Sequence, residues 1–185
     1  MAAMSDLSCR LATFDDLAAM RGVMTRAIDE LQQGFLDPAQ VAASHAIMGL
    51  DRQLVEDSTY FLVEIDGCVA GCGGWSRRAT LYGNDGSAGL REPRLLDPAH
   101  EAARVRAMYT HPDFTRRGVG RHILAAAETA AAAAGFRAAE LMATMAGEPL
   151  YRACGYRPKE AVIDRVGSVD IPLLRMVKPL TPAAP

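Results

Sequence analysis

Two glycines in a basic run are the residues whose types and spacing most directly suggest chemistry. The segment from His111 to Arg121 reads His-Pro-Asp-Phe-Thr-Arg-Arg-Gly-Val-Gly-Arg. Gly118 and Gly120 can adopt backbone angles that are closed to other residues, so successive N–H groups can turn toward one anion. Three arginines add positive charge to the segment: Arg116, Arg117 and Arg121. We therefore predict a cradle for a pyrophosphate group.

The flanking elements must hold this loop in place. Upstream, Ala103 to Thr110 alternates apolar and charged residues, which is the pattern of a strand. Downstream, Val119 to Ala134 is rich in alanine and predicts a helix that ends at Gly135. A Gly-x-Gly pair alone is often only a solvated turn. Strand, basic loop and helix together favour the cradle, because the helix presents its unpaired first-turn N–H groups there.

Two common phosphate motifs are excluded by spacing. A dinucleotide fingerprint needs a third glycine three residues after Gly120, where this chain has Ile123. A Walker loop ends in Gly-Lys-Ser or Gly-Lys-Thr, and neither sequence follows these glycines. The cradle therefore belongs to neither class.

A second segment, Gly147 to Tyr156, completes the pattern. Pro149 suits the first turn of a short helix, Gly155 suits its end, and Tyr151 lies between them, after a predicted strand from Arg137 to Ala143. The sequence Leu-Tyr-x-x-x-Gly-Tyr and the earlier glycine loop together resemble two signatures of the GNAT superfamily of N-acetyltransferases. The usual loop reads Arg/Gln-x-x-Gly-x-Gly/Ala, and here Thr115 occupies the position of the Arg or Gln.

This resemblance implies an α/β fold. The GNAT fold has a central mixed, mostly antiparallel twisted sheet of about seven strands with a splayed parallel pair, flanked by about four helices. The length of 185 residues, half of them hydrophobic, is most economically one domain over 1–185. We expect its core at about 8–178 and a loose tail at 179–185. The resemblance also implies an enzyme that transfers the acetyl group of acetyl-CoA directly to an amine.

The same resemblance assigns roles to residues. Acetyl-CoA would be held by loop and strand residues, namely Met108, Tyr109, Thr110, Arg116, Arg117, Gly118, Val119, Gly120, Arg121 and Thr144. The backbone N–H groups of Met108 to Thr110 would meet the oxyanion, and Thr144 stands where the family often has an Asn on the pantetheine arm. Tyr151 would reach the CoA sulfur and act as general acid, because a phenol with a pKa near 10 stays protonated at neutral pH. The general base is left unnamed, since Arg104 and Arg106 occupy the strand where the family often carries a glutamate.

Alternatives remain from other classes. A non-catalytic acyl-CoA sensor would keep the cradle without turnover. A covalent route through Cys154 lacks a histidine nearby in the sequence. The acceptor amine stays unidentified, and both a monomer and a homodimer are open.

Composition excludes other functions. The formal net charge of -2 argues against a general nucleic-acid binder. No apolar run reaches the length of a membrane span and the N-terminus does not resemble a signal peptide, so we expect a cytoplasmic protein that does not interact with membranes. The four cysteines form no CxxC pair and the four histidines have no metal-ligand spacing, which predicts neither a metal site nor disulfides.

The rest of the chain predicts further elements. Asp66-Gly67 between apolar runs predicts a hairpin, and glycines at 71, 73 and 74 predict a bulge or close packing in its second strand. The other predicted elements are a strand at 8–12, a core helix that Thr13 caps and that runs to Leu31, a helix from 38 to about 48, and strands at 161–166 and 169–176. Arg77 to Glu101 reads as a long loop that either folds over the acceptor or is mobile.

Overall fold

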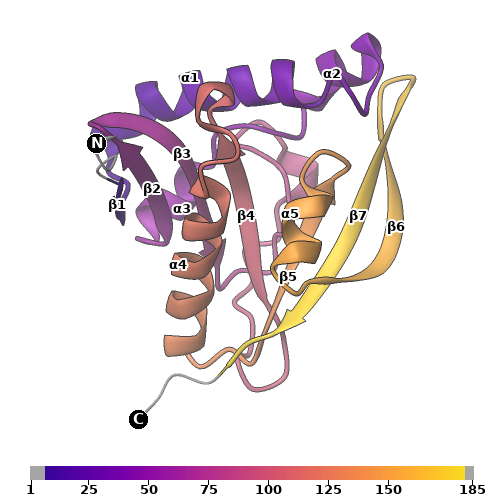
Figure 1. Ribbon diagram of the computed structural model, residues 1–185. Coiled ribbons are helices and arrows are strands. Elements are labelled where there is room, and N and C mark those ends of the chain that lie inside the picture. The colour runs from indigo at the N-terminus through magenta and orange to yellow at the C-terminus, as the bar shows by residue number, and fades with distance from the viewer. Residues whose placement is uncertain (1–6, 182–185) are drawn as a thin grey trace.

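The computed structural model describes residues 7–181 and contains one seven-stranded sheet with the order β1-β2-β3-β4-β5-β7-β6 (Figure 1). Its strands are β1 (Leu7–Leu11), β2 (Tyr60–Ile65), β3 (Cys68–Ser76), β4 (Ala103–Thr110), β5 (Ala138–Thr144), β6 (Arg157–Val166) and β7 (Val169–Pro179). Neighbouring strands are antiparallel except β4 and β5, which are parallel. The mixed sheet with one parallel pair confirms the expected fold class.

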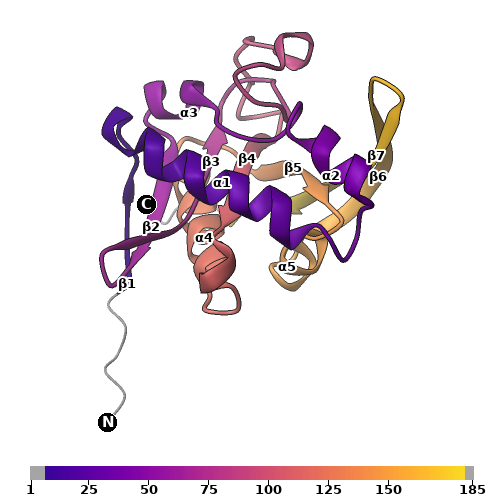
Figure 2. The same ribbon diagram turned by 90° about the horizontal axis from the view of Figure 1, so that it is seen from above.

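Helices cover both faces of the sheet. They are α1 (Leu17–Leu31), α2 (Pro38–Ser44), α3 (Arg52–Glu56), α4 (Val119–Ala133) and α5 (Glu148–Ala153). One core cluster joins α1 and α3 to β2 and β3, and another joins α4 to β4 and β5. Viewed from above, α4 and α5 lie on the same side of the sheet (Figure 2). The sheet is thus packed between two helical layers.

The two long helices follow the sequence prediction, except that the residues after the predicted cap Thr13, Phe14–Asp16, form a 3-10 turn ahead of α1. In α1 the buried side chains are Met20, Val23, Met24, Ala27 and Ile28, which repeat at helical spacing. In α4 the side chains of Ile123, Leu124, Ala127 and Ala131 are buried at helical spacing, and Gly135 follows the helix with a φ of 94° that favours glycine. Burial of these faces fixes both helices against the sheet.

The second helix ends earlier than predicted. It stops at Ser44 instead of continuing to about Met48. The side-chain amide of Asn84 donates hydrogen bonds to the carbonyls of His45 and Met48, at 3.0 and 2.8 Å, so a distant loop holds this segment outside the helix. The short helix α3 was not predicted, although Asp51 caps it by accepting a hydrogen bond from the N–H of Gln53.

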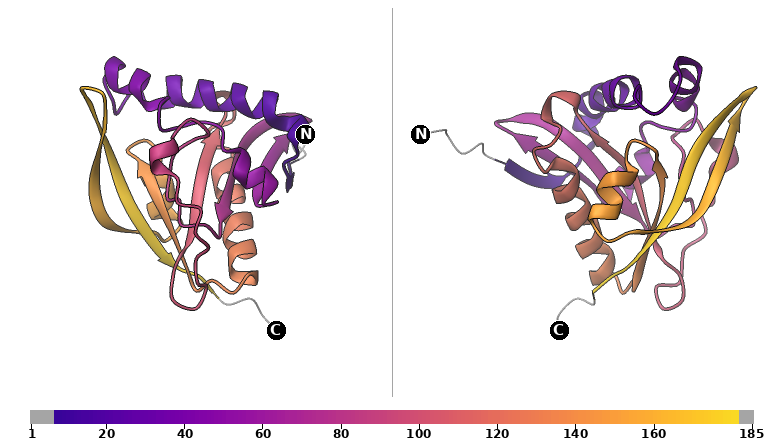
Figure 3. Two further views of the ribbon diagram at one scale, coloured as in Figure 1. Left: turned by 180° about the vertical axis from the view of Figure 1, so that it is seen from behind. Right: turned by 45° about the vertical axis from the view of Figure 1, so that its right-hand side comes forward.

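The predicted hairpin between β2 and β3 is confirmed, and close packing explains its glycines. A side chain on Gly71 would collide with Val119, and one on Gly73 would collide with Met108. The last hairpin, β6–β7, is longer than predicted at both outer ends, and its turn rises beside α2 (Figure 3). The amide of Gln40 in α2 donates to the carbonyl of Asp170 at 2.8 Å, near the start of β7.

The chain remains packed just beyond Lys178. β7 continues to Pro179, the N–H of Leu180 donates to the carbonyl of Arg137 at 2.9 Å, and Leu180 is buried. The remainder of the expected loose tail, 182–185, lies outside the described residues. Within residues 7–181, none of the helices has the length and apolar character needed to cross a membrane.

Candidate active site

The parallel strands β4 and β5 pair only at their beginnings. Ala103 pairs with Ala139 and Arg104 with Glu140, and no register continues beyond these residues. On the side of β4 that faces β5, the backbone N–H and C=O groups after Arg104 therefore have no strand partner. This is the splayed pair that the sequence resemblance implied.

A β-bulge lies in the unpaired half of β4. Cys72 pairs with Tyr109 and Gly74 pairs with Arg106, so Ala107 and Met108 together face a single residue of β3. Ala107 has a φ of 51°, which is uncommon for a residue with a side chain. The bulge bends β4 beyond its last pair with β5, which is at Arg104.

A cavity of about 100 Å³ occupies the gap between the two strands. Four residues predicted for the site line it, namely Met108, Tyr109, Thr144 and Tyr151. Others come from segments that the sequence did not assign to the site, including Ile47, Met48, Arg106 and Leu173. The loop 77–101 contributes Leu81, Tyr82 and Gly83, so it packs against the cavity.

Tyr151 projects from α5 into this cavity. Its side chain is 7% exposed, and its ring makes an edge-to-face contact with Tyr156 at a centroid distance of 5.9 Å. Within residues 7–181, its hydroxyl has no hydrogen-bond partner. Burial, and to a smaller extent the neighbouring Cys154, raises the pKa of Tyr151 above its usual value. The phenol is therefore protonated, and its O–H group donates a hydrogen bond to none of the described residues.

Thr144 lines the cavity at the end of β5. Its Oγ1 accepts a hydrogen bond from the N–H of Gly147 at 3.1 Å, which fixes the turn leading into α5. Gly147 in turn packs against Tyr151, because an added Cβ would lie 3.0 Å from its ring. Thr144 thus positions the start of the helix that carries Tyr151, and its hydroxyl proton remains available.

The glycine loop leads directly into α4. Gly118 has a φ of 83° and stands at the N-cap, and Arg116 has a φ of 64°. Within residues 7–181, His122 is the first residue of α4 whose N–H finds a backbone carbonyl, that of Gly118. The preceding N–H groups, those of Val119 and Gly120 among them, are the unpaired donors of a helix N-terminus.

The cradle and α5 are in close contact. An added Cβ on Gly120 would lie 2.7 Å from Cδ2 of Leu150 and 3.6 Å from Oγ1 of Thr110. Gly120 therefore allows the start of α4 to approach both α5 and the end of β4. The three arginines of the loop, Arg116, Arg117 and Arg121, are exposed, and the Arg117 guanidinium lies 5.3 Å from the Phe114 ring.

The arginines on β4 are engaged in ion pairs. Nη2 of Arg106 lies 2.6 Å from Oδ2 of Asp51, and both side chains are almost fully buried. Arg104 pairs with Glu140. Within residues 7–181, no three His, Cys, Asp or Glu side chains form a group that could hold a metal ion.

A second, larger cavity of about 460 Å³ adjoins the first. It lies among α1, the segment between α2 and α3, and the loop residues Asn84 to Gly86. Met48 lines both cavities. Tyr109 links the segment between α2 and α3 to β4, because its hydroxyl accepts a hydrogen bond from the N–H of Gly49 at 2.7 Å.

Comparison with known proteins agrees with this architecture. A family model described as the acetyltransferase (GNAT) family matches residues 22–156. No curated protein sequence matches the chain. A GCN5-related N-acetyltransferase structure from Rhodopseudomonas palustris, which also bears the description aminotransferase class II, has 17% identity and a TM-score of 0.70, covering 97% of this chain and 99% of its own.

Two similar structures contain the expected cosubstrate or its product. PaiA N-acetyltransferase from Thermoplasma acidophilum, in complex with coenzyme A, has 14% identity and a TM-score of 0.63, covering 94% of this chain and 99% of its own. YncA of Salmonella typhimurium, described as a possible acetyltransferase with its cofactor acetyl-CoA, has 18% identity and a TM-score of 0.62. The match covers 97% of this chain and 96% of that chain. With a family model that spans 22–156, the chain belongs to the acetyltransferase (GNAT) family.

Proposed function

We propose that this protein is an acetyl-CoA-dependent N-acetyltransferase that acts on an amine by direct attack. The observation that carries the proposal is the cavity between β4 and β5. Tyr151, Thr144 and the bulged end of β4 all line it. The glycine start of α4 packs against α5 beside it.

Donor binding would use backbone groups first. The unpaired N–H groups from Gly118 to Gly120 suit a pyrophosphate, and the helix dipole of α4 adds to the attraction. This explains how Thr115 can replace the usual Arg or Gln. The pantetheine arm would then run between β4 and β5, where the unpaired edge of β4 offers it hydrogen bonds.

The reaction needs one bond made and one broken. The amine nitrogen attacks the thioester carbonyl, and the C–S bond breaks as the tetrahedral intermediate collapses. Tyr151 would give its proton to the departing thiolate, which has a reference pKa of about 8.5 that burial in the same cavity raises. The phenol is protonated at neutral pH, so it can donate without a preceding proton uptake.

The negative charge on the carbonyl oxygen also needs donors. The bulge and the missing pairing leave N–H groups of the segment Met108 to Thr110 without a partner on β5. One such donor contributes about 3 kcal/mol to lowering a barrier of this kind. We assign the oxyanion site to this stretch of β4.

The acceptor would approach through the larger cavity. That cavity opens beside α1 and meets the smaller one at Met48. Among the described residues that line the smaller cavity, Arg106 is the one with a charged side chain, and no carboxylate is present to take the amine proton. Water would therefore remove this proton, which favours acceptors whose amine pKa lies near 8 over those near 10.

Thiol release from acetyl-CoA tests the proposal. A panel of small amines, amino acids and peptide N-termini is offered at pH 8, and acetylated product is identified by mass spectrometry. We expect thiol release that depends on at least one amine. Tight CoA binding with no turnover on any amine would instead identify an acyl-CoA sensor. Preferential binding of a dinucleotide over CoA would contradict both assignments.

A further inference from the structure

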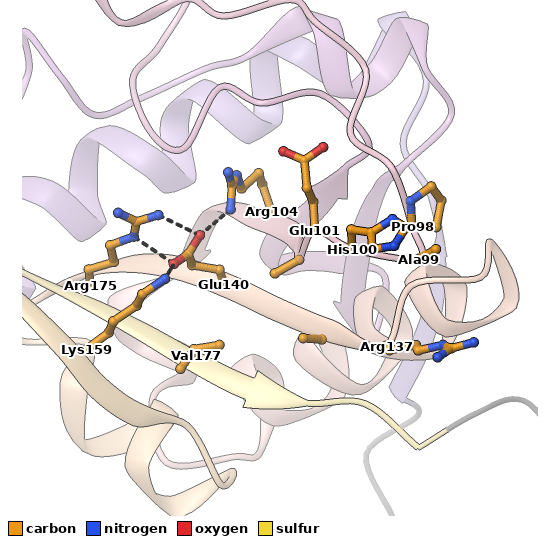
Figure 4. A pocket seen from close by; sticks show the side chains of 12 residues that line it. Pro98, Ala99, His100, Glu101, Arg104, Arg137, Glu140, Lys159, Arg175 and Val177 are labelled. Carbon is orange, nitrogen blue, oxygen red and sulfur yellow. Dashed lines mark hydrogen bonds and ion pairs between the residues drawn. The ribbon is translucent and has the colours of Figure 1, made fainter.

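A third hollow lies at the end of the sheet opposite the cradle. Its volume is about 370 Å³, and it is formed by the first residues of β4 and β5, the segment 98–102, and parts of β6 and β7 (Figure 4). The candidate active site uses the last residues of β4 and β5. The two sites therefore share strands but occupy opposite ends of them.

Positive charge dominates this hollow. Four cationic residues line it, namely Arg104, Arg137, Lys159 and Arg175. Glu101 and Glu140 are the acidic residues of the lining, which leaves a formal excess of two positive charges among the lining side chains. Glu160, outside the lining, lies 3.7 Å from Arg175. Glu101 is moreover paired at 2.8 Å with Arg94, which lies outside the lining. The excess is local, because the whole chain has a net charge of -2.

Glu140 is buried beneath three of these cations. It accepts hydrogen bonds from Arg175 at 2.7 and 2.9 Å, from Lys159 at 3.0 Å, and from Arg104 (Figure 4). Its side chain is 3% exposed, whereas that of Lys159 is 52% exposed. One carboxylate thus anchors three cations, and the ammonium of Lys159 has two further N–H donors on the open side.

Arg137 is the fourth cation that lines the hollow. Within residues 7–181, its side chain makes no hydrogen bond or ion pair. Its side chain extends away from the Glu140 cluster, at the other end of the hollow (Figure 4). A ligand seated in the hollow would meet the ammonium of Lys159 at one end, and Arg137 would reach the ligand from the other end by turning its exposed side chain inward.

We propose that this hollow binds a small dianionic oxyanion, either inorganic phosphate or the phosphate group of a small metabolite. A dianion would match the excess of two positive charges, and charge-assisted hydrogen bonds from Lys159 and Arg137 would hold it. A volume of about 370 Å³ exceeds that of a phosphate ion and leaves room for a small organic group. The assignment is independent of acetyl transfer.

Calorimetric titration with sodium phosphate tests the proposal. Saturating CoA fills the cradle first, and sodium chloride keeps the ionic strength constant. The test variant is Lys159→Gln with Arg137→Gln. The matched control is Arg157→Gln with Arg165→Gln. It also removes two positive charges, from arginines that do not line the hollow. Both pairs are exposed enough to leave the core intact.

We expect saturable phosphate binding in the wild type and the control, weakened at least tenfold in the test variant. Glycerol 3-phosphate in a parallel titration distinguishes the source, since tighter binding than inorganic phosphate assigns a phosphorylated metabolite and weaker binding assigns the free ion. Absence of saturable binding of either ligand to the wild type would overturn the proposal. Equal affinities in the test and control variants would also overturn it.

Discussion

The hydroxyl of Tyr60 on β2 donates a hydrogen bond to the carbonyl of Ala107 on β4, at 3.0 Å. Tyr60 is fully buried, and Ala107 is the residue of the bulge with a positive φ. The contact therefore reaches across β3 to the point where β4 departs from regular strand geometry. A buried tyrosine outside the cavity holds the bend that opens the cavity.

Replacing Tyr60 with phenylalanine tests this contact. The change leaves the Ala107 carbonyl without its donor in a buried setting, which costs about 1 to 2 kcal/mol of the free energy of unfolding. We also expect kcat to fall about tenfold while CoA affinity stays unchanged, because the loosened bulge carries the oxyanion donors. Denaturant titration and steady-state kinetics measure the two effects. An unchanged kcat would show that the bulge keeps its geometry without Tyr60.

Tyr151→Phe should remove the proton donor and little else. We expect kcat to fall about 100-fold, within the range for a general acid, with CoA affinity within twofold of the wild type. Tyr156→Phe is the matched control, since Tyr156 packs against Tyr151 but does not line the cavity. Its kcat should remain within a factor of two. Equal effects of the two substitutions would remove Tyr151 from the mechanism.

The pH profile of kcat provides a separate test of the same residue. Because burial raises the pKa of Tyr151, the phenol keeps its proton to a higher pH than an exposed tyrosine. We therefore expect no alkaline decline of kcat below about pH 10, the ordinary value for tyrosine. A decline centred well below that pH, lost in Tyr151→Phe, would contradict the raised pKa.

Side chains at position 120 should weaken CoA binding. An added Cβ would lie 2.7 Å from Cδ2 of Leu150, the far end of a flexible side chain, so Leu150 must turn aside in Gly120→Ala and CoA binding should weaken slightly. Gly120→Glu should weaken it further through its charge. Gly22→Ala is the matched control, because Gly22 lies within α1 with no atom near its added Cβ. The control should bind CoA normally and gain about 0.5 to 1 kcal/mol in stability. CoA affinity that is equal in Gly120→Ala and Gly22→Ala would refute the close-packing argument.

Glu140→Gln should destabilise the fold. Burial alone would raise the pKa of Glu140, but hydrogen bonds from Arg175 and Lys159 and the charge of Arg104 outweigh it and hold the pKa below its usual value. A carboxyl with a lowered pKa stabilises the fold above its unfolded pKa of about 4.3 and loses that contribution as the pH falls through its folded value.

The substitution leaves three cations around a neutral amide, so we expect a loss of about 3 kcal/mol at pH 7. This difference in the free energy of unfolding between the wild type and Glu140→Gln should be smaller at pH 3. Urea titrations at the two pH values measure the difference. A deficit of the same size at both would indicate that lost packing, and not charge, causes it.

Local patterns predicted much of the fold. The alanine-rich repeat of α4, the Asp66-Gly67 turn and the alternation in β4 are governed by neighbours in the sequence, and the structure confirms each element. The end of α2 could not be predicted, because it is fixed by Asn84, about 40 residues away. The first half of β6 was missed because it is an exposed edge strand, and its residues show no buried alternation.

The candidate site was also predictable only in part from local sequence patterns. Tyr151, Thr144 and the β4 residues were found through short motifs, and they line one cavity. Met48, Leu81 and Leu173 carry no chemical signature in the sequence, and only tertiary packing brings them to that cavity. The sequence of the loop 77–101 has two interpretations, a cover over the acceptor and a mobile segment, and the structure packs its residues 81–83 against the cavity. The ion pair of Arg106 with Asp51 joins residues that no local pattern connects.

The β4 bulge also determines which face of the sheet each later side chain of the strand occupies. Arg106 and Tyr109 lie on the α1 side although three positions separate them, while Met108 packs toward α4. The extra residue of the bulge thus moves each later side chain of β4 to the opposite face of the sheet. Removing one residue at 107 would turn Tyr109 away from Gly49 and Thr110 away from Gly120. This stretch of chain should therefore accept no change of length.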